Sequence, residues 1–103
     1  MNEDPSRVEF IELIFPSVDS FGFDERDDIE DALDAMLGQS GMGYVSGAGA
    51  GLGVLELGIE VDERVRGEPQ NVIGTVLEIV RTFNFPEGSY LLAYPTSLQH
   101  IEL

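Results

Sequence analysis

Two periods of apolar residues divide the chain into six elements. Residues 7–15 and 54–61 alternate in the manner of β-strands. The first of these segments is largely apolar on both faces, which is typical of a strand in the middle of a sheet. One face of the two strands is predicted to point inward, and it comprises Ile11, Leu13, Phe15, Leu55, Leu57, Ile59 and Val61.

Two further segments have the period of a helix. The first is expected to begin with Asp24 as its N-cap and to stop at Gly38. The second is expected to begin at about Pro69, and its internal Gly74 is predicted to mark a close approach to the sheet. The apolar stripe of the first helix comprises Ile29, Ala32, Leu33, Met36 and Leu37, and that of the second comprises Val72, Val76, Val80 and Phe83.

The remaining strands are expected around Tyr44 and over residues 89–94, with a short extra strand possible in the tail at 99–103. The order is then βαββαβ. This order predicts an α+β, ferredoxin-like two-layer sandwich, in which a four-stranded antiparallel sheet carries two helices on one face. The whole chain, residues 1–103, is expected to form this one domain.

The pleat of the strands also predicts what the opposite, open face of the sheet presents. The last strand adds either Tyr90, Leu92 and Tyr94 or Leu91 and Ala93. A face of this character is more apolar than a monomer usually leaves exposed, so we expect a second copy to cover it in a two-fold homodimer. The C-terminal tail, a ligand or a partner protein are the alternatives. The predicted interface comprises Val8, Phe10, Glu12, Ile14, Val54 and Glu56.

Charge limits the partners of the protein. Twenty carboxylates stand against five arginines, there is no lysine, and the net charge is −15. Such a surface repels nucleic acid and anionic membranes, and it leaves a basic protein, cations or a salt-rich cytoplasm as its counterpart. The chain has no cysteine, and its acidic first residues and short apolar runs are not those of a signal peptide or a membrane span, so a cytoplasmic location is expected.

The first helix carries a row of carboxylates on the face opposite its apolar stripe. Asp27, Glu30, Asp31 and Asp34 follow the i, i+3, i+4, i+7 spacing. The row is interpreted either as a solvated face or as a docking stripe for a basic protein surface. Because this segment is helical, the ligand spacing of a calcium loop is not met, and no metal site is expected.

A run of alternating glycines occupies positions 47–53. Gly47, Gly49, Gly51 and Gly53 do not match the spacing of dinucleotide-binding or phosphate-binding loops. We interpret the run as the loop of a wide, bulged or flexible hairpin, with a mobile flap over a ligand as the alternative. No catalytic residue and no cofactor is predicted from any motif of the chain.

Residues 43–60, followed after a helix by Phe85-Pro86-Glu87-Gly88-Ser89, resemble a pattern of small uncharacterised bacterial proteins. In these proteins a glycine-rich hairpin leads into an alternating acidic strand, and a Pro-x-Gly turn precedes the last strand. The resemblance implies the ferredoxin-like fold and a bacterial source, and it implies no functional site.

Two functions lead the hypotheses, ahead of a third, a catalyst that uses carboxylates. The first is a non-enzymatic module that binds a basic protein through its acidic surface, as an immunity or inhibitor protein does. The second is a metabolite-sensing domain of the ACT type, with its ligand at a dimer interface beside the glycine run. Sensitivity of binding to ionic strength separates them, because only the first depends on charge.

Overall fold

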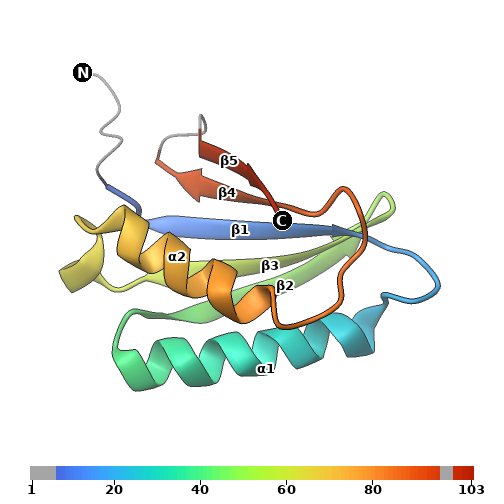
Figure 1. Ribbon diagram of the computed structural model, residues 1–103, viewed down its shortest axis with the longest axis horizontal. Coiled ribbons are helices and arrows are strands. Elements are labelled where there is room, and N and C mark those ends of the chain that lie inside the picture. The colour runs from blue at the N-terminus through green and yellow to red at the C-terminus, as the bar shows by residue number, and fades with distance from the viewer. Residues whose placement is uncertain (1–6, 96–98) are drawn as a thin grey trace.

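Five antiparallel strands and two helices make up the part of the protein that a computed structural model describes, residues 7–95 and 99–103. The acidic first residues considered above lie outside it. The sheet has the order β2-β3-β1-β4-β5 (Figure 1). The elements are β1 (Phe10–Pro16), α1 (Phe23–Ser40), β2 (Gly43–Gly51), β3 (Val54–Val61), the 3-10 helix η1 (Glu63–Val65), α2 (Pro69–Val80), β4 (Tyr90–Tyr94) and β5 (Gln99–Glu102).

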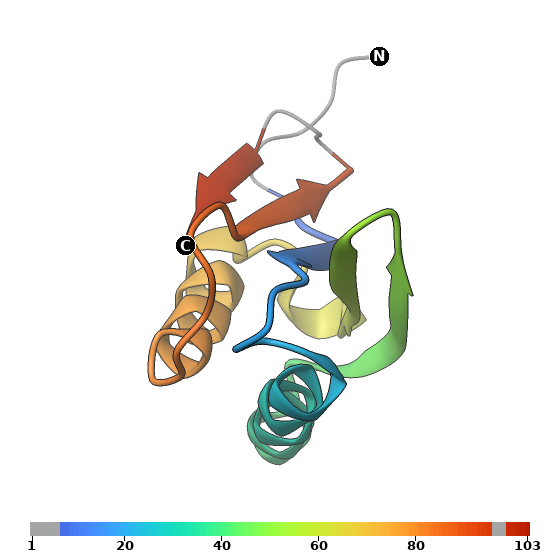
Figure 2. The same ribbon diagram turned by 90° about the vertical axis from the view of Figure 1, so that its right-hand side faces the viewer.

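The fold is thus α+β, and its first four strands are ordered as in a ferredoxin-like sandwich. The prediction of four strands was wrong by one, because the tail returns as β5 and pairs antiparallel with β4. Both predicted central strands, β1 and β3, are interior to the sheet. The helices lie on the same side of the sheet, and no helix or strand of the described residues covers its other face (Figure 2).

The predicted parity of β1 and β3 is confirmed. All seven predicted inward residues are buried, with at most 2% of their surface exposed, and they form one core with the buried faces of the helices. Burying each such side chain contributes roughly 1.5–3 kcal/mol, so this layer between sheet and helices carries most of the stability.

On β4 the structure selects one of the two expected parities. Leu91 and Ala93 are buried in the core, so Tyr90, Leu92 and Tyr94 lie on the open face. Val8, in contrast, was wrongly placed on the open face, because it is fully buried and belongs to the core. It precedes β1, and the chain bends at residue 9, so the alternation of the strand does not extend back to it.

Helix α1 is longer at both ends than the sequence predicted. Its N-cap is Gly22 rather than Asp24, and the carboxylate of Glu25 accepts a hydrogen bond of 2.7 Å from the Gly22 N–H. Its C-cap is Gly41, with φ of +73°, so Gly38 is an internal residue of the last turns. Glycine signals a helix end only where the chain takes up the left-handed conformation, and Gly38 does not.

Helix α2 is confirmed from Pro69, and its buried side chains are Val72, Ile73, Val76, Ile79 and Val80. The prediction for Gly74 was wrong. This residue is exposed, and a Cβ placed on it would meet nothing within 4 Å. It marks no close approach to the sheet.

The glycine run is a strand and not a loop. Gly47, Gly49 and Gly51 belong to β2, and the connection to β3 is a two-residue turn at Leu52 and Gly53. Both turn residues have positive φ, +53° and +82°, as a tight hairpin of twisted strands requires. The hairpin is therefore narrow rather than wide, and its bulge lies between Val45 and Gly47, at the start of the run rather than within it.

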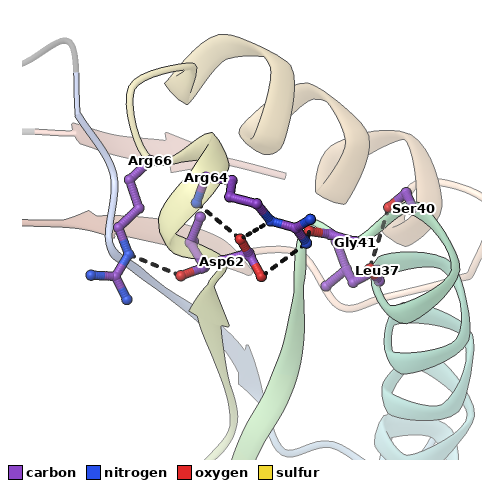
Figure 3. A network of polar contacts seen from close by, with 7 residues as sticks. Leu37, Ser40, Gly41, Asp62, Arg64 and Arg66 are labelled. Atoms are coloured by element: carbon purple, nitrogen blue, oxygen red, sulfur yellow. Dashed lines mark hydrogen bonds and ion pairs between the residues drawn. The ribbon is translucent and has the colours of Figure 1, made fainter.

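The C-terminal end of α1 is joined to the start of η1 by a network of polar contacts (Figure 3). Arg64 donates to both carboxylate oxygens of Asp62, at 2.9 and 3.3 Å, and to the carbonyl of Gly41 at 3.4 Å. The hydrogen bonds from Arg64 hold the pKa of Asp62 below its usual value. These contacts tie the C-terminus of α1 to the chain that follows β3, and so fix the helix relative to the sheet.

Candidate functional site

Helix α1 lies along the outermost strand of the sheet, β2, and two of its side chains are hydrogen-bonded to that strand. The guanidinium of Arg26 donates to the carbonyl of Gly49 at 2.9 Å. The carboxylate of Asp34 accepts from the N–H of Val45 at 3.0 Å. The helix and the strand thus lie side by side, at least over residues 26–34 and 45–49.

Arg26 is the residue that sequence reasoning missed. It lies on the buried stripe of α1, with 9% of its surface exposed, in line with Ile29, Leu33 and Leu37. Its other nitrogens contact Asp27, and the guanidinium lies 5.1 Å from the centre of the Phe23 ring. The available signal was its spacing, three residues before Ile29, on a helix that has no other basic residue.

The predicted acidic row of α1 is only partly free. Asp27 is paired with Arg26 at 3.1 Å, and Asp34 is occupied with Val45. Glu30 is half-buried and Asp31 is exposed. The structure therefore keeps the row on one side of the helix, but it gives two of its four members a structural role as well.

The whole helix is acidic beyond this row. It holds seven carboxylates and one arginine, which leaves a net charge of −6 on 18 residues. Because Arg26 and Asp34 fix α1 against β2, these charges stand beside the outer strand. We call α1 and β2 together the acidic edge of the protein.

The strand of the acidic edge has an unusual sequence for its position. Its nine residues, Gly43–Gly51, include no charged side chain and no proline, and among the described residues its one partner strand is β3. Edge strands are usually short or carry charge or proline, which prevents other chains from pairing with them. The strand at the other edge, β5, has four residues and follows that rule. Two protective devices act on β2: the bulge at Ser46, and the carboxylate of Asp34 on α1, which occupies the N–H of Val45.

The open face of the sheet is the second predicted site. The ring of Phe10 lies over Gly58, where a Cβ would come within 2.8 Å of it, and it also contacts the ring of Tyr94, with 6.0 Å between centroids. The hydroxyl of Tyr94 donates to Glu12 at 3.1 Å. Burial, followed by this hydrogen bond and the nearby carboxylates, raises the pKa of Tyr94, so its phenol remains a donor at neutral pH.

These contacts cover the open face more than the sequence indicated. Ile14, on this face, has only 6% of its surface exposed, while Phe10, Glu12, Val54 and Glu56 are half-buried. With Val8 in the core, five of the six predicted interface residues share the face. The large apolar side chains that are exposed lie elsewhere or at its margin: Val18, Phe23, Met36, Tyr44 and Leu52.

Other candidate features of the described residues are modest. A surface hollow of about 290 Å³ is lined by Ser20, Phe21, Asn84, Phe85 and Pro86, and none of these side chains titrates. Within residues 7–95 and 99–103, no three carboxylate or histidine side chains are grouped so as to hold a metal ion. None of the described helices is long and apolar enough to span a membrane.

Comparison of the chain with protein-family models, curated proteins and solved structures found no significant match.

Proposed function

We propose that the protein is a non-enzymatic binding module that recognises a basic protein segment through its acidic edge. The observation that carries this proposal is the concentration of charge on α1. Seven of the twenty carboxylates of the chain lie on this helix, against one on α2. A surface that serves solubility alone has no need to gather its charge on one helix.

The arrangement of α1 also supports the proposal. Like charges at i, i+3 and i, i+4 destabilise a helix by a few tenths of a kcal/mol for each pair. Asp31 has such neighbours on both sides, at Asp27, Asp28 and Asp34. A basic partner relieves this repulsion on binding and is attracted over a distance by the same field.

The ferredoxin-like classification and the homodimer belong with this proposal as separate hypotheses. The order of β1 to β4 supports the first. For the second, the apolar area of the open face is smaller than expected, since Ile14 is already covered and Val8 lies in the core. Light scattering at micromolar concentration measures the oligomeric state, and a monomeric mass would overturn the homodimer hypothesis.

The ACT-type alternative has less support than the binding of a basic segment. It requires a ligand beside a loop at Gly47–Gly53, and three of these glycines lie in a regular strand. The hollow beside Phe21 is formed by the β1–α1 and α2–β4 connections and lies away from β2 in the chain.

The proposal is tested with a peptide of known charge. We expect a nine-residue peptide of alternating lysine and valine to bind at low ionic strength, and its affinity to fall steeply as salt is added, because exposed charges are screened. Replacing two acidic residues of α1, Glu30→Gln with Asp31→Asn, is expected to weaken binding about three- to tenfold. Fluorescence anisotropy of a labelled peptide measures both effects.

A matched variant on the other helix serves as the control. Glu78→Gln removes one exposed carboxylate from α2, is compared with Asp31→Asn alone on α1, and is expected to leave the affinity unchanged. If it weakens binding as much as the change on α1, the peptide responds to net charge alone and the acidic edge is not the site.

A further inference from the structure

We propose that the partner binds by adding a strand to β2, so that an extended basic segment pairs with the backbone of residues 47–51, beyond the bulge, while its cationic side chains face α1. This inference rests on the proposed function and deepens it, because it names the mode of binding. The carrying observation is a long, uncharged edge strand that, in the part of the chain that the structure describes, pairs on one side.

The register of the hairpin shows which backbone groups of β2 are available. In a two-residue hairpin the residues that flank the turn, here Gly51 and Val54, exchange hydrogen bonds with each other. Alternate residues then point their N–H and C=O groups away from β3, and these are Ala50 and Ala48. No side chain of the described residues is hydrogen-bonded to the backbone of either alanine.

The side chains of β2 leave room for another strand. Ala48 and Ala50 are opposite Leu57 and Leu55 and so lie on the helix side, yet both are exposed. Gly47, Gly49 and Gly51 have no side chains on the open face. A segment that extends along this edge therefore meets methyl groups and backbone rather than bulky or charged side chains.

Charge selects a basic segment over a second copy of the chain. Two copies paired through β2 would place both α1 helices on the same side of the joined sheet, each with a net charge of −6 and each on a protein of net charge −15. A strand with lysine or arginine at alternate positions meets the same helix with opposite charge. The hydrogen bonds of Arg26 to Gly49 and of Asp34 to Val45 show that α1 lies beside this part of the strand.

The test keeps charge constant and changes only the backbone. Binding of the alternating lysine–valine peptide is compared with that of a counterpart N-methylated at its three central amides, which keeps every charge but loses its N–H donors on both edges. We expect the counterpart to bind at least about tenfold more weakly. Amide hydrogen exchange of the full chain is expected to slow at Ala48 and Ala50 with the first peptide and not with the second.

A variant of the protein provides an independent reading. Ala48→Pro removes an N–H that points away from β3. The variant is therefore expected to keep its fold and to bind the unmodified peptide about tenfold more weakly. Ala50→Pro tests the same prediction if the first variant does not fold.

The possible results separate the two proposals. Equal, salt-dependent binding of both peptides overturns strand addition and leaves the acidic surface as the site. Absence of binding by either peptide at low salt overturns both. Slowed exchange of β2 that depends on protein concentration, in the absence of peptide, assigns the edge to a second copy and overturns the basic partner.

Discussion

The two helices pack on the same face of the sheet but are held there in different ways. Helix α2 buries five apolar side chains in 12 residues and carries one carboxylate. Helix α1 has 18 residues, seven carboxylates and only three buried apolar side chains, with Arg26 as the fourth buried residue. Helix α2 is an ordinary core helix, whereas the surface of α1 is mostly charged. Seven of the twenty carboxylates of the protein therefore lie on one of its two α-helices.

This difference has a consequence for stability. Most helices in proteins are stabilised by burial of an apolar face rather than by intrinsic propensity. Helix α1 has few buried side chains and many like charges. We therefore expect the loss of one of its contacts with the sheet to lower the stability of the protein more than the loss of one contact of α2.

Loss of one apolar contact of α1 is expected to have the largest effect. Leu33 is fully buried in the middle of the helix, and Leu33→Ala should lower the free energy of unfolding by about 3 kcal/mol through lost burial and the cavity that remains. Urea denaturation measures it. Met36→Ala, one turn away and 45% exposed, is the control and should change the value by less than about 0.5 kcal/mol. Equal effects would mean that α1 is not held by its stripe.

Replacement of the buried arginine, Arg26, is expected to cause the second-largest loss of stability. Arg26→Met keeps an apolar stem but loses the hydrogen bond to Gly49, and it should cost about 2 kcal/mol. Hydrogen exchange of β2 should speed up in the same variant. Asp27→Asn weakens only the exposed ion pair of Arg26 and should cost less than about 1 kcal/mol. A stable Arg26→Met protein would show that the helix is anchored by its apolar residues alone.

Charge reversal on α1 is expected to stabilise the protein. Asp31→Lys replaces three like-charge neighbours by attractions and should raise the free energy of unfolding by about 1 kcal/mol at low salt, with the gain declining as salt is added. Glu78→Lys on α2 has no acidic neighbour at i±3 or i±4 and should give no gain. A similar gain from both changes would instead point to net charge as the cause.

The smallest effects are expected from the exposed glycines of the two helices. Gly38 in α1 and Gly74 in α2 have open space where a Cβ would lie. Alanine at either position should raise the free energy of unfolding by about 0.5–1 kcal/mol, since it restricts the unfolded chain and favours the helix. Thermal unfolding of the two variants should give shifts of the same sign, and a loss at Gly74 would revive the expected close approach to the sheet.

Periodicity predicted the layers of the fold because the burial of a strand depends mainly on its own alternation. The inward residues of β1 and β3 followed from this rule, and so did the helical stripes. The prediction for Val8 was wrong because a bend before the strand interrupts the alternation. The parity of β4 stayed open until the structure resolved it, since both faces of that segment are apolar.

The acidic edge was less predictable, because its parts are far apart in the sequence. The carboxylates of α1 were visible, but the contacts of Asp34 with Val45 and of Arg26 with Gly49 depend on where the helix packs. Glycine is rare in strands, and so the run at 47–53 was interpreted as a loop. The run forms a strand because it pairs with β3 and is hydrogen-bonded to α1, and these contacts restrict its flexible backbone.

The contact between Phe10 and Gly58 has an implication for how the sequence can change over time. The aromatic ring on β1 occupies the volume that a side chain on β3 would need, so the two strands share one space between them. A larger residue at position 58 is compatible with the fold only when position 10 becomes small. Related chains are therefore expected to vary at these two positions together, with the bulky group on either strand but not on both.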